Sequence, residues 1–189
     1  MISCEVCGES LAKPARGRVP RFCGTRCRVA SHRQQQRFYV PEELKDHDRW
    51  IRHKDKRPFA LKGYYLSIHD DSQWARFEDA RNCTKGDGIG FVLNGDGIVC
   101  IDLDDCVERG RINSKARALI DSLPKTFVEF SPSGKGLHIW GYGNVDGGRK
   151  FEKDGLKVEV YGTGRYLTVS GNTYTKAPLA KLELDELVG

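Results

Sequence analysis

Short apolar runs interrupted by glycine dominate the chain from Gly88 onward. These runs are rich in β-branched and aromatic residues and are bounded by turn-forming residues, a pattern typical of strands. Two of them flank Asn94-Gly95-Asp96-Gly97, a turn sequence that predicts a β-hairpin. The expected strands are Ile89–Leu93, Ile98–Asp104, Phe127–Phe130, Leu137–Tyr142, Leu156–Tyr161 and Tyr166–Val169.

Helical patterns are confined to short segments. Apolar residues recur at helical spacing over Asn113–Leu123. Residues 41–82 indicate helical and irregular structure, with one helix starting after Pro41 and another over Ser72–Ala80, capped by its first residue. The residues after Pro178 fit a short amphipathic helix or a tail. A few helices with mostly antiparallel strands predict an α+β domain, with the helices packed on one sheet.

Two aspartates end the strand expected over Ile98–Asp104. Side chains alternate between the faces of a strand, so Asp102 and Asp104 share one face while Ile101 and Leu103 point into the core. Neighbouring carboxylates repel, which makes ionising both costly unless a cation lies between them. Oxygen ligands suit hard divalent ions, so the pair is a candidate site for Mg²⁺ or Mn²⁺. The alternative is a structural strand that ends in a solvated acidic turn.

A glycine-rich turn precedes the strand that carries His138. Its sequence, Ser131-Pro132-Ser133-Gly134-Lys135-Gly136, offers backbone N–H groups and one ammonium, which suit phosphate groups. The glycine spacing of a P-loop is missing. A lone histidine between apolar neighbours on a strand is more often structural than functional, so both roles are open for His138.

The strand Leu156–Tyr161 contributes a third carboxylate. Glu159 alternates with Val158 and Val160, and it therefore faces away from the core. Arg165 follows within a few residues. An aspartate pair, a phosphate-type turn and a third carboxylate on strands of one sheet indicate a site for two metal ions and a triphosphate.

The excess positive charge lies at the N-terminus. The first 40 residues hold eight Lys/Arg and two Asp/Glu, whereas the other 149 residues hold 23 Lys/Arg and 24 Asp/Glu. A compact basic module favours a polyanion, because each neutralised phosphate releases counterions. A solvated charged surface is the alternative. We expect two domains, a zinc-binding basic module over residues 1–40 and a catalytic domain over residues 41–189.

Zinc is predicted from cysteine spacing. Cys4-x2-Cys7 and Cys23-x3-Cys27 supply two ligand pairs, as a tetrahedral Zn²⁺ site requires. The metal would replace the core that so short a segment lacks. His32 is an alternative ligand to Cys27, and free structural thiols are the competing interpretation.

The chain shows no sign of export. No apolar run approaches the length of a membrane helix, and the N-terminus lacks the apolar stretch of a signal peptide. Seven cysteines, an odd number without an export signal, argue for metal binding or reduced thiols. We expect a soluble, cytoplasmic protein with no membrane partner.

The order of these motifs resembles the archaeo-eukaryotic primase superfamily, and most closely the primase-polymerase domain of phage and plasmid replication proteins. The resemblance spans Pro41 to Gly171 and includes Lys56-Arg57-Pro58-Phe59, Trp74 with Phe77, and Asp87–Phe91. It implies a catalytic sheet of RNA-recognition-motif type. It also implies a DNA primase and polymerase that makes or extends primers on single-stranded DNA from nucleoside triphosphates, with a replicative helicase as a further partner.

The resemblance also implies residue roles. Asp102, Asp104 and Glu159 would hold Mg²⁺ or Mn²⁺, and His138 would contact the incoming triphosphate. In many members a serine stands at the position of Gly136, and here Ser133 is expected to compensate. The cysteine-rich segment precedes the catalytic domain instead of lying inside or after it. The residues expected at the nucleotide are Ser133, Gly134, Lys135, Gly136, His138 and Arg165.

Two other functions compete with synthesis. A metal-dependent nuclease would use the same acidic cluster, but it needs an activated water and no triphosphate anchor. A non-enzymatic zinc-ribbon nucleic-acid-binding protein would use the acidic strand only structurally. Magnesium-dependent incorporation of nucleotides separates all three.

Overall fold

The computed structural model describes residues 2–14 and 16–188, apart from the side chains of residues 32–37, 186 and 188. The expectation for His32 as a zinc ligand lies outside the described side chains. The chain forms two compact units, Met1–Phe38 and Tyr39–Gly189. None of the helices in the described part is both long and apolar enough to cross a membrane.

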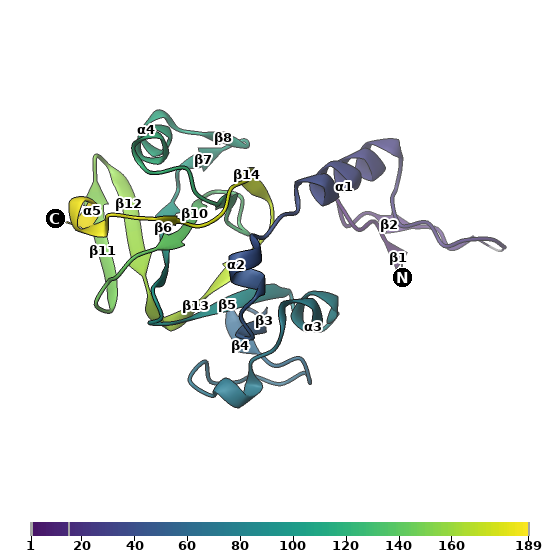
Figure 1. The fold of residues 1–189 in the computed structure, drawn as a ribbon. Helices are drawn as coiled ribbons and strands as arrows, with labels where there is room; N and C mark the ends of the chain where they lie inside the picture. Colours follow the sequence, from purple (N-terminus) through teal and green to yellow (C-terminus); the bar gives the residue numbers. More distant parts are fainter. Residues whose placement is uncertain (1, 15, 189) are drawn as a thin grey trace. The chain divides into compact units, whose positions relative to one another are not determined.

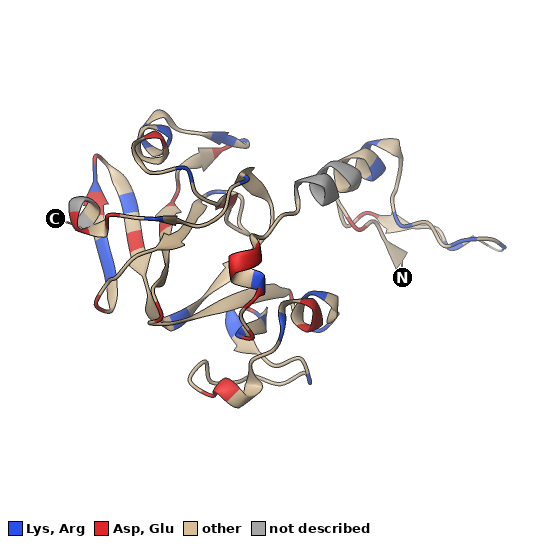
Figure 2. Ribbon diagram, in the orientation of Figure 1, with Lys and Arg blue, Asp and Glu red and all other residues tan. Residues whose placement is uncertain are grey.

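The first unit has little regular structure. β1 (Ile2–Ser3) pairs with β2 (Ser10–Leu11) in antiparallel fashion, and α1 (Thr25–Arg37) follows. Among the described side chains of this unit, only Cys4 is buried. Figure 2 shows basic residues prevailing over acidic ones in this unit.

A seven-stranded sheet forms the larger part of the second unit (Figure 1). The strands follow the order β11-β12-β6-β10-β9-β14, and β15 pairs with β10. Only the β10–β15 pairing is parallel in the described residues. The strand bounds are β6 Ile98–Asp104, β9 Val128–Phe130, β10 Leu137–Tyr142, β11 Gly148–Lys153, β12 Leu156–Tyr161, β14 Thr173–Thr175 and β15 Ala180–Lys181.

A second, four-stranded sheet lies beside it in the order β13-β5-β3-β4. All its pairings are antiparallel. Its strands are β3 Trp50–Lys54, β4 Arg57–Phe59, β5 Gly88–Asn94 and β13 Thr163–Val169. A small hairpin completes the set of strands, with β7 at Val107–Glu108 and β8 at Arg111–Ile112.

The helices of the second unit are short. Asn113 caps α4, since its side chain accepts a hydrogen bond from the amide of Ala116. The helices are α2 Glu42–Lys45, the 3₁₀ helix η1 Asp71–Gln73, α3 Phe77–Asn82, α4 Ser114–Ser122 and α5 Leu184–Val188. The unit is therefore α+β with mostly antiparallel strands, as the sequence predicts, but its strands form two main sheets and not the single sheet expected.

Each sheet contributes to a buried core. Ile101 and Leu103 of β6 are fully buried in a cluster with α4 and α5, which confirms their predicted orientation. On the opposite face of the same sheet, Trp140 meets Phe91 of the smaller sheet at 5.9 Å between ring centroids. Trp50 packs on Phe91 at 5.1 Å. The contact of Trp140 with Phe91 thus joins the two sheets, and Trp50 supports Phe91 from within the smaller sheet.

The predicted hairpin of β5 and β6 is wrong. β5 pairs with β3 and β13, whereas β6 pairs with β10 and β12 in the other sheet. The loop between them passes from one sheet to the other, and the amide of Gly95 donates to the carbonyl of Gly162, where β12 passes into β13. Turn chemistry is local, and it does not reveal that both strands have other partners.

The prediction for residues 41–82 is right in part. The helix after Pro41 is present, but the helix expected over Ser72–Ala80 is wrong, because η1 and α3 occupy this region separately and α3 begins only after Arg76. β3, β4 and β11 were not predicted, and neither were the short strands β1, β2, β7, β8, β14 and β15. The turn between β3 and β4, at Asp55 and Lys56, contains no glycine or proline, so its hairpin lacks the usual sequence signal.

Candidate active site and metal centre

β6 lies at the centre of the candidate site. It runs between β12 and β10, and Asp102 is the register partner of Glu159 on one side and of His138 on the other. Directly opposed residues of neighbouring strands share a face of the sheet. The fold therefore brings these three predicted residues into one row across three strands.

Asp102 is the more enclosed of the two aspartates. Its side chain is 19% exposed, whereas Asp104 at the strand end is exposed. Burial raises the pKa of Asp102, and His138 opposes this shift while the charges of Asp104 and Glu159 add to it. A carboxylate whose ionised form is disfavoured in this way gains most from a bound cation. Asp102 and Asp104 thus fit a divalent metal.

Glu159 has partners other than the aspartates. Its carboxylate accepts a 2.5 Å hydrogen bond from the ammonium of Lys150 and another from the hydroxyl of Tyr161, and Arg165 lies 3.5 Å away. Burial raises the pKa of Glu159, but the bonds from Lys150 and Tyr161 outweigh it, so the pKa falls below its usual value. In the described residues, the three carboxylates do not converge as closely as the cysteines described below.

His138 is held by a fully buried glutamate. Its Nδ1 lies 3.3 Å from the Oε1 of Glu129, and its Nε2 lies 3.7 Å from the Oδ1 of Asp102. Burial lowers the pKa of His138, but the hydrogen bond and charge of Glu129 and the charge of Asp102 outweigh it and raise the pKa. Glu129 also accepts bonds from Trp140, Ser170 and the amide of Gly171.

Glu129 therefore fixes the orientation of the imidazole ring. Its contact with Nδ1 turns Nε2 toward Asp102 and the cavity described below, since the two ring nitrogens point in opposite directions. The sequence alone does not reveal Glu129 as a residue of the site. Its strand position, one residue before Phe130 and opposite His138 in register, gives no signal until β9 and β10 are paired.

The glycine-rich turn folds on itself through its serines. The Oγ of Ser131 accepts from the amide of Gly136 at 3.1 Å, and the Oγ of Ser133 accepts from the amide of Lys135 at 3.2 Å. Gly134 occupies the left-handed region with φ +70°. A Cβ at Gly136 would lie 2.5 Å from the carbonyl oxygen of Leu103, so glycine is required where this turn approaches β6.

A cavity of about 500 Å³ opens between the two sheets and joins most of these groups. Asp102, Asp104, His138, Ser133 and Arg165 line it. Gly134, Lys135, Gly136 and Glu159 are not among the residues that line it. The smaller sheet contributes residues that sequence analysis did not assign to the site, namely His53, Lys56, Pro58 and Tyr166.

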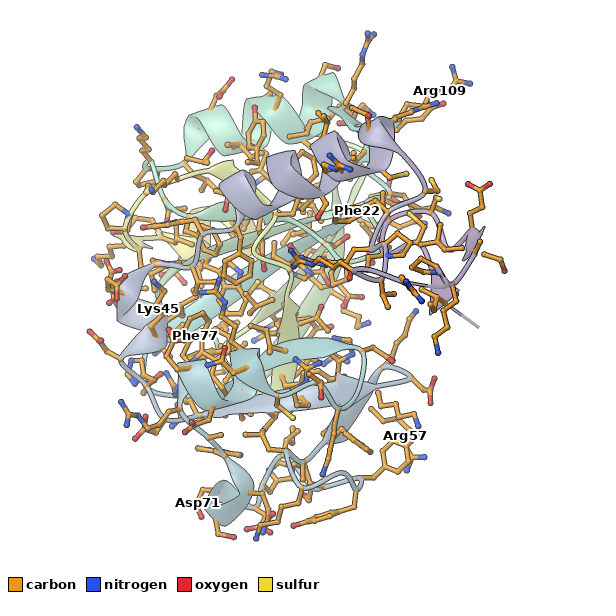
Figure 3. The ribbon with its side chains drawn as sticks, turned by 90° about the vertical axis from the view of Figure 1, so that its right-hand side faces the viewer. Phe22, Lys45, Arg57, Asp71, Phe77 and Arg109 are labelled. Atoms are coloured by element: carbon orange, nitrogen blue, oxygen red, sulfur yellow. The ribbon has the colours of Figure 1, made fainter. Side chains whose placement is uncertain are left out.

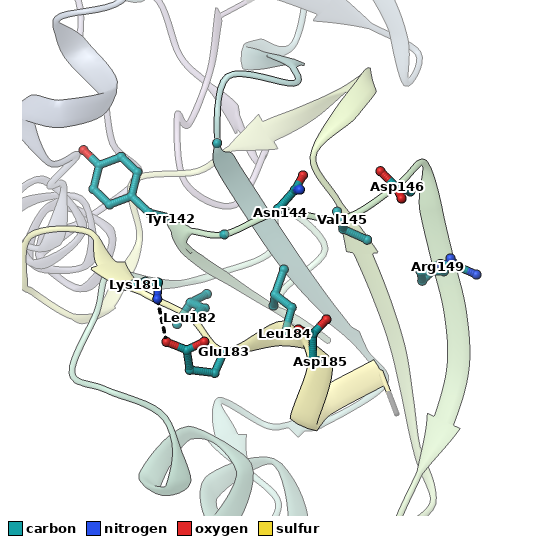
Figure 4. A pocket seen from close by; sticks show the side chains of 12 residues that line it. Tyr142, Asn144, Val145, Asp146, Arg149, Lys181, Leu182, Glu183, Leu184 and Asp185 are labelled. Atoms are coloured by element: carbon teal, nitrogen blue, oxygen red, sulfur yellow. Dashed lines mark ion pairs between the residues drawn. The ribbon is translucent and has the colours of Figure 1, made fainter.

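Another cavity, of about 590 Å³, lies at the C-terminal end of β10 (Figure 4). Tyr142, Asp146, Arg149 and an ion pair of Lys181 with Glu183 at 2.9 Å border it. It includes none of the predicted site residues. The cavity between the sheets is therefore the candidate active site.

The four cysteines of the first unit form a separate cluster. The Sγ atoms of Cys4, Cys7, Cys23 and Cys27 all lie within 4.8 Å of one another. Backbone hydrogen bonds from Cys7 and Val6 lower the pKa of Cys4 to about 6, whereas hydrogen bonds from Cys27 and Cys7 raise the pKa of Cys23. Thiolates in this arrangement are the ligands that tetrahedral Zn²⁺ prefers. The cluster could hold a zinc ion.

An ion pair ties the two cysteine-bearing loops together. Arg21 donates to both carboxylate oxygens of Glu5, at 2.7 and 2.8 Å, and the amide of Glu5 donates to the carbonyl of Arg21. These residues lie beside Cys4 and Cys23 in sequence. The loops are thus joined by contacts besides the sulfur cluster.

The chain is similar in sequence to a phage protein. No family model matches the chain. The chain is 32% identical over 146 aligned residues to a protein named DNA primase-polymerase from Nitratiruptor phage NrS-1, and the match covers 69% of this chain. It covers 20% of the phage protein, so the chain spans about a fifth of the length of that relative. The site described above belongs to a chain similar to a phage DNA primase-polymerase.

Proposed function

We propose that the second unit is a template-directed nucleotidyl transferase, a DNA primase-polymerase that makes or extends primers on single-stranded DNA. The observation that carries the proposal is the row of Glu159, Asp102 and His138 across three paired strands, beside a cavity. Similarity to the phage protein supports it. We propose further that the larger sheet is of RNA-recognition-motif type.

Asp102 and Asp104 would hold Mg²⁺ or Mn²⁺ from the end of β6, and Glu159 would be a third ligand. Such ions, when bound, lower the pKa of an attacking 3′-hydroxyl and neutralise a triphosphate. When no metal is bound, Lys150 and Arg165 balance the charge of Glu159, which limits repulsion among the carboxylates.

His138 would act on the nucleotide instead of the metals. Glu129 turns its Nε2 toward the cavity, where an N–H could donate to a phosphate oxygen as negative charge develops. Arg165 and Ser133 line the same cavity and would bind the triphosphate. Lys135, Gly134 and Gly136 would act indirectly, by shaping the turn that positions Ser133.

The first unit would be a zinc-stabilised grip for the template. The cysteine cluster could hold Zn²⁺, and the unit carries the excess positive charge of the chain. We propose that the zinc module supplies most of the affinity for single-stranded DNA, with a strong dependence on salt.

Incorporation of labelled nucleotides on a single-stranded DNA template tests the proposed reaction. The wild-type protein should extend or initiate strands with Mg²⁺ or Mn²⁺, and a chelator should stop it. The test uses ribo- and deoxyribonucleotides, with and without a primer. No incorporation under any of these conditions would refute the polymerase proposal, and cleavage of the template in the same tubes would favour a nuclease.

The two roles of His138 can be separated by choice of substitution. His138→Asn keeps an N–H near the position of Nδ1, so the bond to Glu129 is preserved while the group at Nε2 is lost. We expect a higher KM for nucleotide and a lower kcat, with thermal stability close to wild type. His138→Ala should also lose about 1–3 kcal/mol of stability, because Glu129 loses a buried partner. A His138→Asn variant with wild-type kinetics would make the histidine purely structural.

A further inference from the structure

The β3–β4 hairpin and the residues just after it gather positive charge on a unit whose charges nearly balance overall. Four cations lie within nine residues that contain a single acid, Asp55, and all four are exposed. Among the described residues, no ion pair joins any of the four to a carboxylate. Unpaired cations gathered in this way attract a polyanion. The four residues are Lys54, Lys56, Arg57 and Lys62.

Two exposed tyrosines lie beside these cations. Tyr64 is 44% exposed and Tyr65 is 42% exposed. The guanidinium of Arg57, which projects outward at the edge of the unit in Figure 3, lies 4.1 Å from the ring centroid of Tyr65. Exposed rings with a stacked arginine form the kind of surface on which unpaired bases stack.

The tyrosine rings are held in place by the fold. Tyr65 forms a bridge with Phe59 of β4, and their rings meet edge to face at 5.4 Å. The hydroxyl of Tyr64 donates to the Oε1 of Gln73 at 2.5 Å. Rings that are already ordered lose little conformational entropy when a ligand binds, which favours a binding role.

The hairpin turn connects this surface to the candidate active site. Asp55 and Lys56 both have positive φ, 51° and 58°, as a two-residue hairpin turn requires. Glycine is the preferred residue at the second of these positions, so a lysine here costs conformational energy. Lys56 lines the cavity that contains Asp102 and Asp104. The cationic surface is thus continuous with the cavity.

We infer that this surface binds single-stranded nucleic acid and delivers the template strand to the cavity. We call it the β3–β4 patch and define it as Lys54, Lys56, Arg57, Lys62, Tyr64 and Tyr65. Cations suit the phosphate backbone, and exposed rings need bases that are not paired, which selects a single strand. The inference rests on the proposed function for the identity of the strand, but binding can be measured without synthesis.

Charge neutralisation within the full chain tests the backbone contacts. Arg57→Gln with Lys62→Gln should weaken binding of a labelled single-stranded oligonucleotide and reduce the slope of log K against log salt by about 1.4, or about 0.7 for each lost phosphate contact. The matched control is Lys115→Gln with Lys125→Gln. Both control residues are exposed and lie on or just after α4, which Figure 1 places at the opposite end of this unit. The control should leave the slope unchanged.

Removal of a ring tests stacking separately. Tyr64→Ala should weaken binding at least about fivefold at every salt concentration, with the slope unchanged. Tyr142→Ala removes another exposed tyrosine, 39% exposed at the end of β10, and should bind like wild type. Crosslinking of an oligonucleotide that contains 4-thiothymidine should label the peptide that carries Tyr64 and Tyr65.

The outcomes keep the two proposals apart. If the patch variants bind like their controls and crosslinks fall elsewhere, the patch is not a nucleic-acid site, even if the wild type synthesises strands. If the patch variants lose binding but the wild type never incorporates nucleotides, the patch stands and the polymerase proposal fails.

Discussion

Asp102→Asn should lower metal-dependent nucleotide incorporation about 1,000-fold or more while the fold stays intact. Asparagine keeps the shape of the side chain but removes the charge that would bind a divalent ion, and that ion contributes several kcal/mol to the transition state. Asp104→Asn should have a similar effect. The measurement is steady-state incorporation on a primed single-stranded template with saturating Mg²⁺ or Mn²⁺.

The same substitution should raise the stability of the metal-free protein. The folded-state pKa of Asp102 lies above its unfolded value, so the folded state binds more protons between these two values. The contribution of Asp102 to the stability of the wild-type protein is therefore greatest below the unfolded-state pKa. It declines as the pH rises through the folded-state pKa. Asp102→Asn should remove that decline and add about 0.5–2 kcal/mol at neutral pH in the presence of a chelator.

An exposed aspartate away from the cavity serves as the control. Asp121 is exposed on α4 and does not line the cavity, so Asp121→Asn should change neither incorporation nor stability. Asp102→Asn with a lower melting temperature and near-normal incorporation would show that the acidic strand is structural. If Asp102→Asn loses both activity and fold, the Asp104→Asn variant decides between the two roles. The side chain of Asp104 is exposed, so its substitution carries no such structural cost.

Removal of zinc should unfold the first unit and leave the second folded. Among the described side chains of the first unit only Cys4 is buried, so the unit lacks a hydrophobic core that could replace the metal. The second unit has its own core of strands and helices. Metal analysis should find about one zinc per chain, and a strong chelator should abolish one of two thermal transitions.

Cysteine variants connect this effect to the cluster. Cys4→Ser and Cys23→Ser should each lower the zinc content and lose the same transition. Cys83→Ser is the control, because Cys83 lies in the second unit outside the cluster. Protein purified without added zinc that contains none, together with variants of unchanged stability, would show that the thiols are free and structural.

Sequence alone determined which residues share a face of each strand in the site. Alternation along a strand places every second side chain on one face, and the core positions of Ile101 and Leu103 follow from it. The bounds of Leu137–Tyr142 and Leu156–Tyr161 were also predicted correctly. Paired cysteine spacing predicted a cluster that the fold does bring together.

Tertiary structure decided which strands are neighbours and which groups surround the site. Periodicity specifies the face of a strand but not its partners, so β5 and β6 were wrongly paired. Glu129 and Lys150 meet their partners only through β9 and β11. Gly136 is explained only by the approach of its turn to Leu103. These contacts join residues far apart in sequence, and they depend on sheet order, which no local pattern encodes.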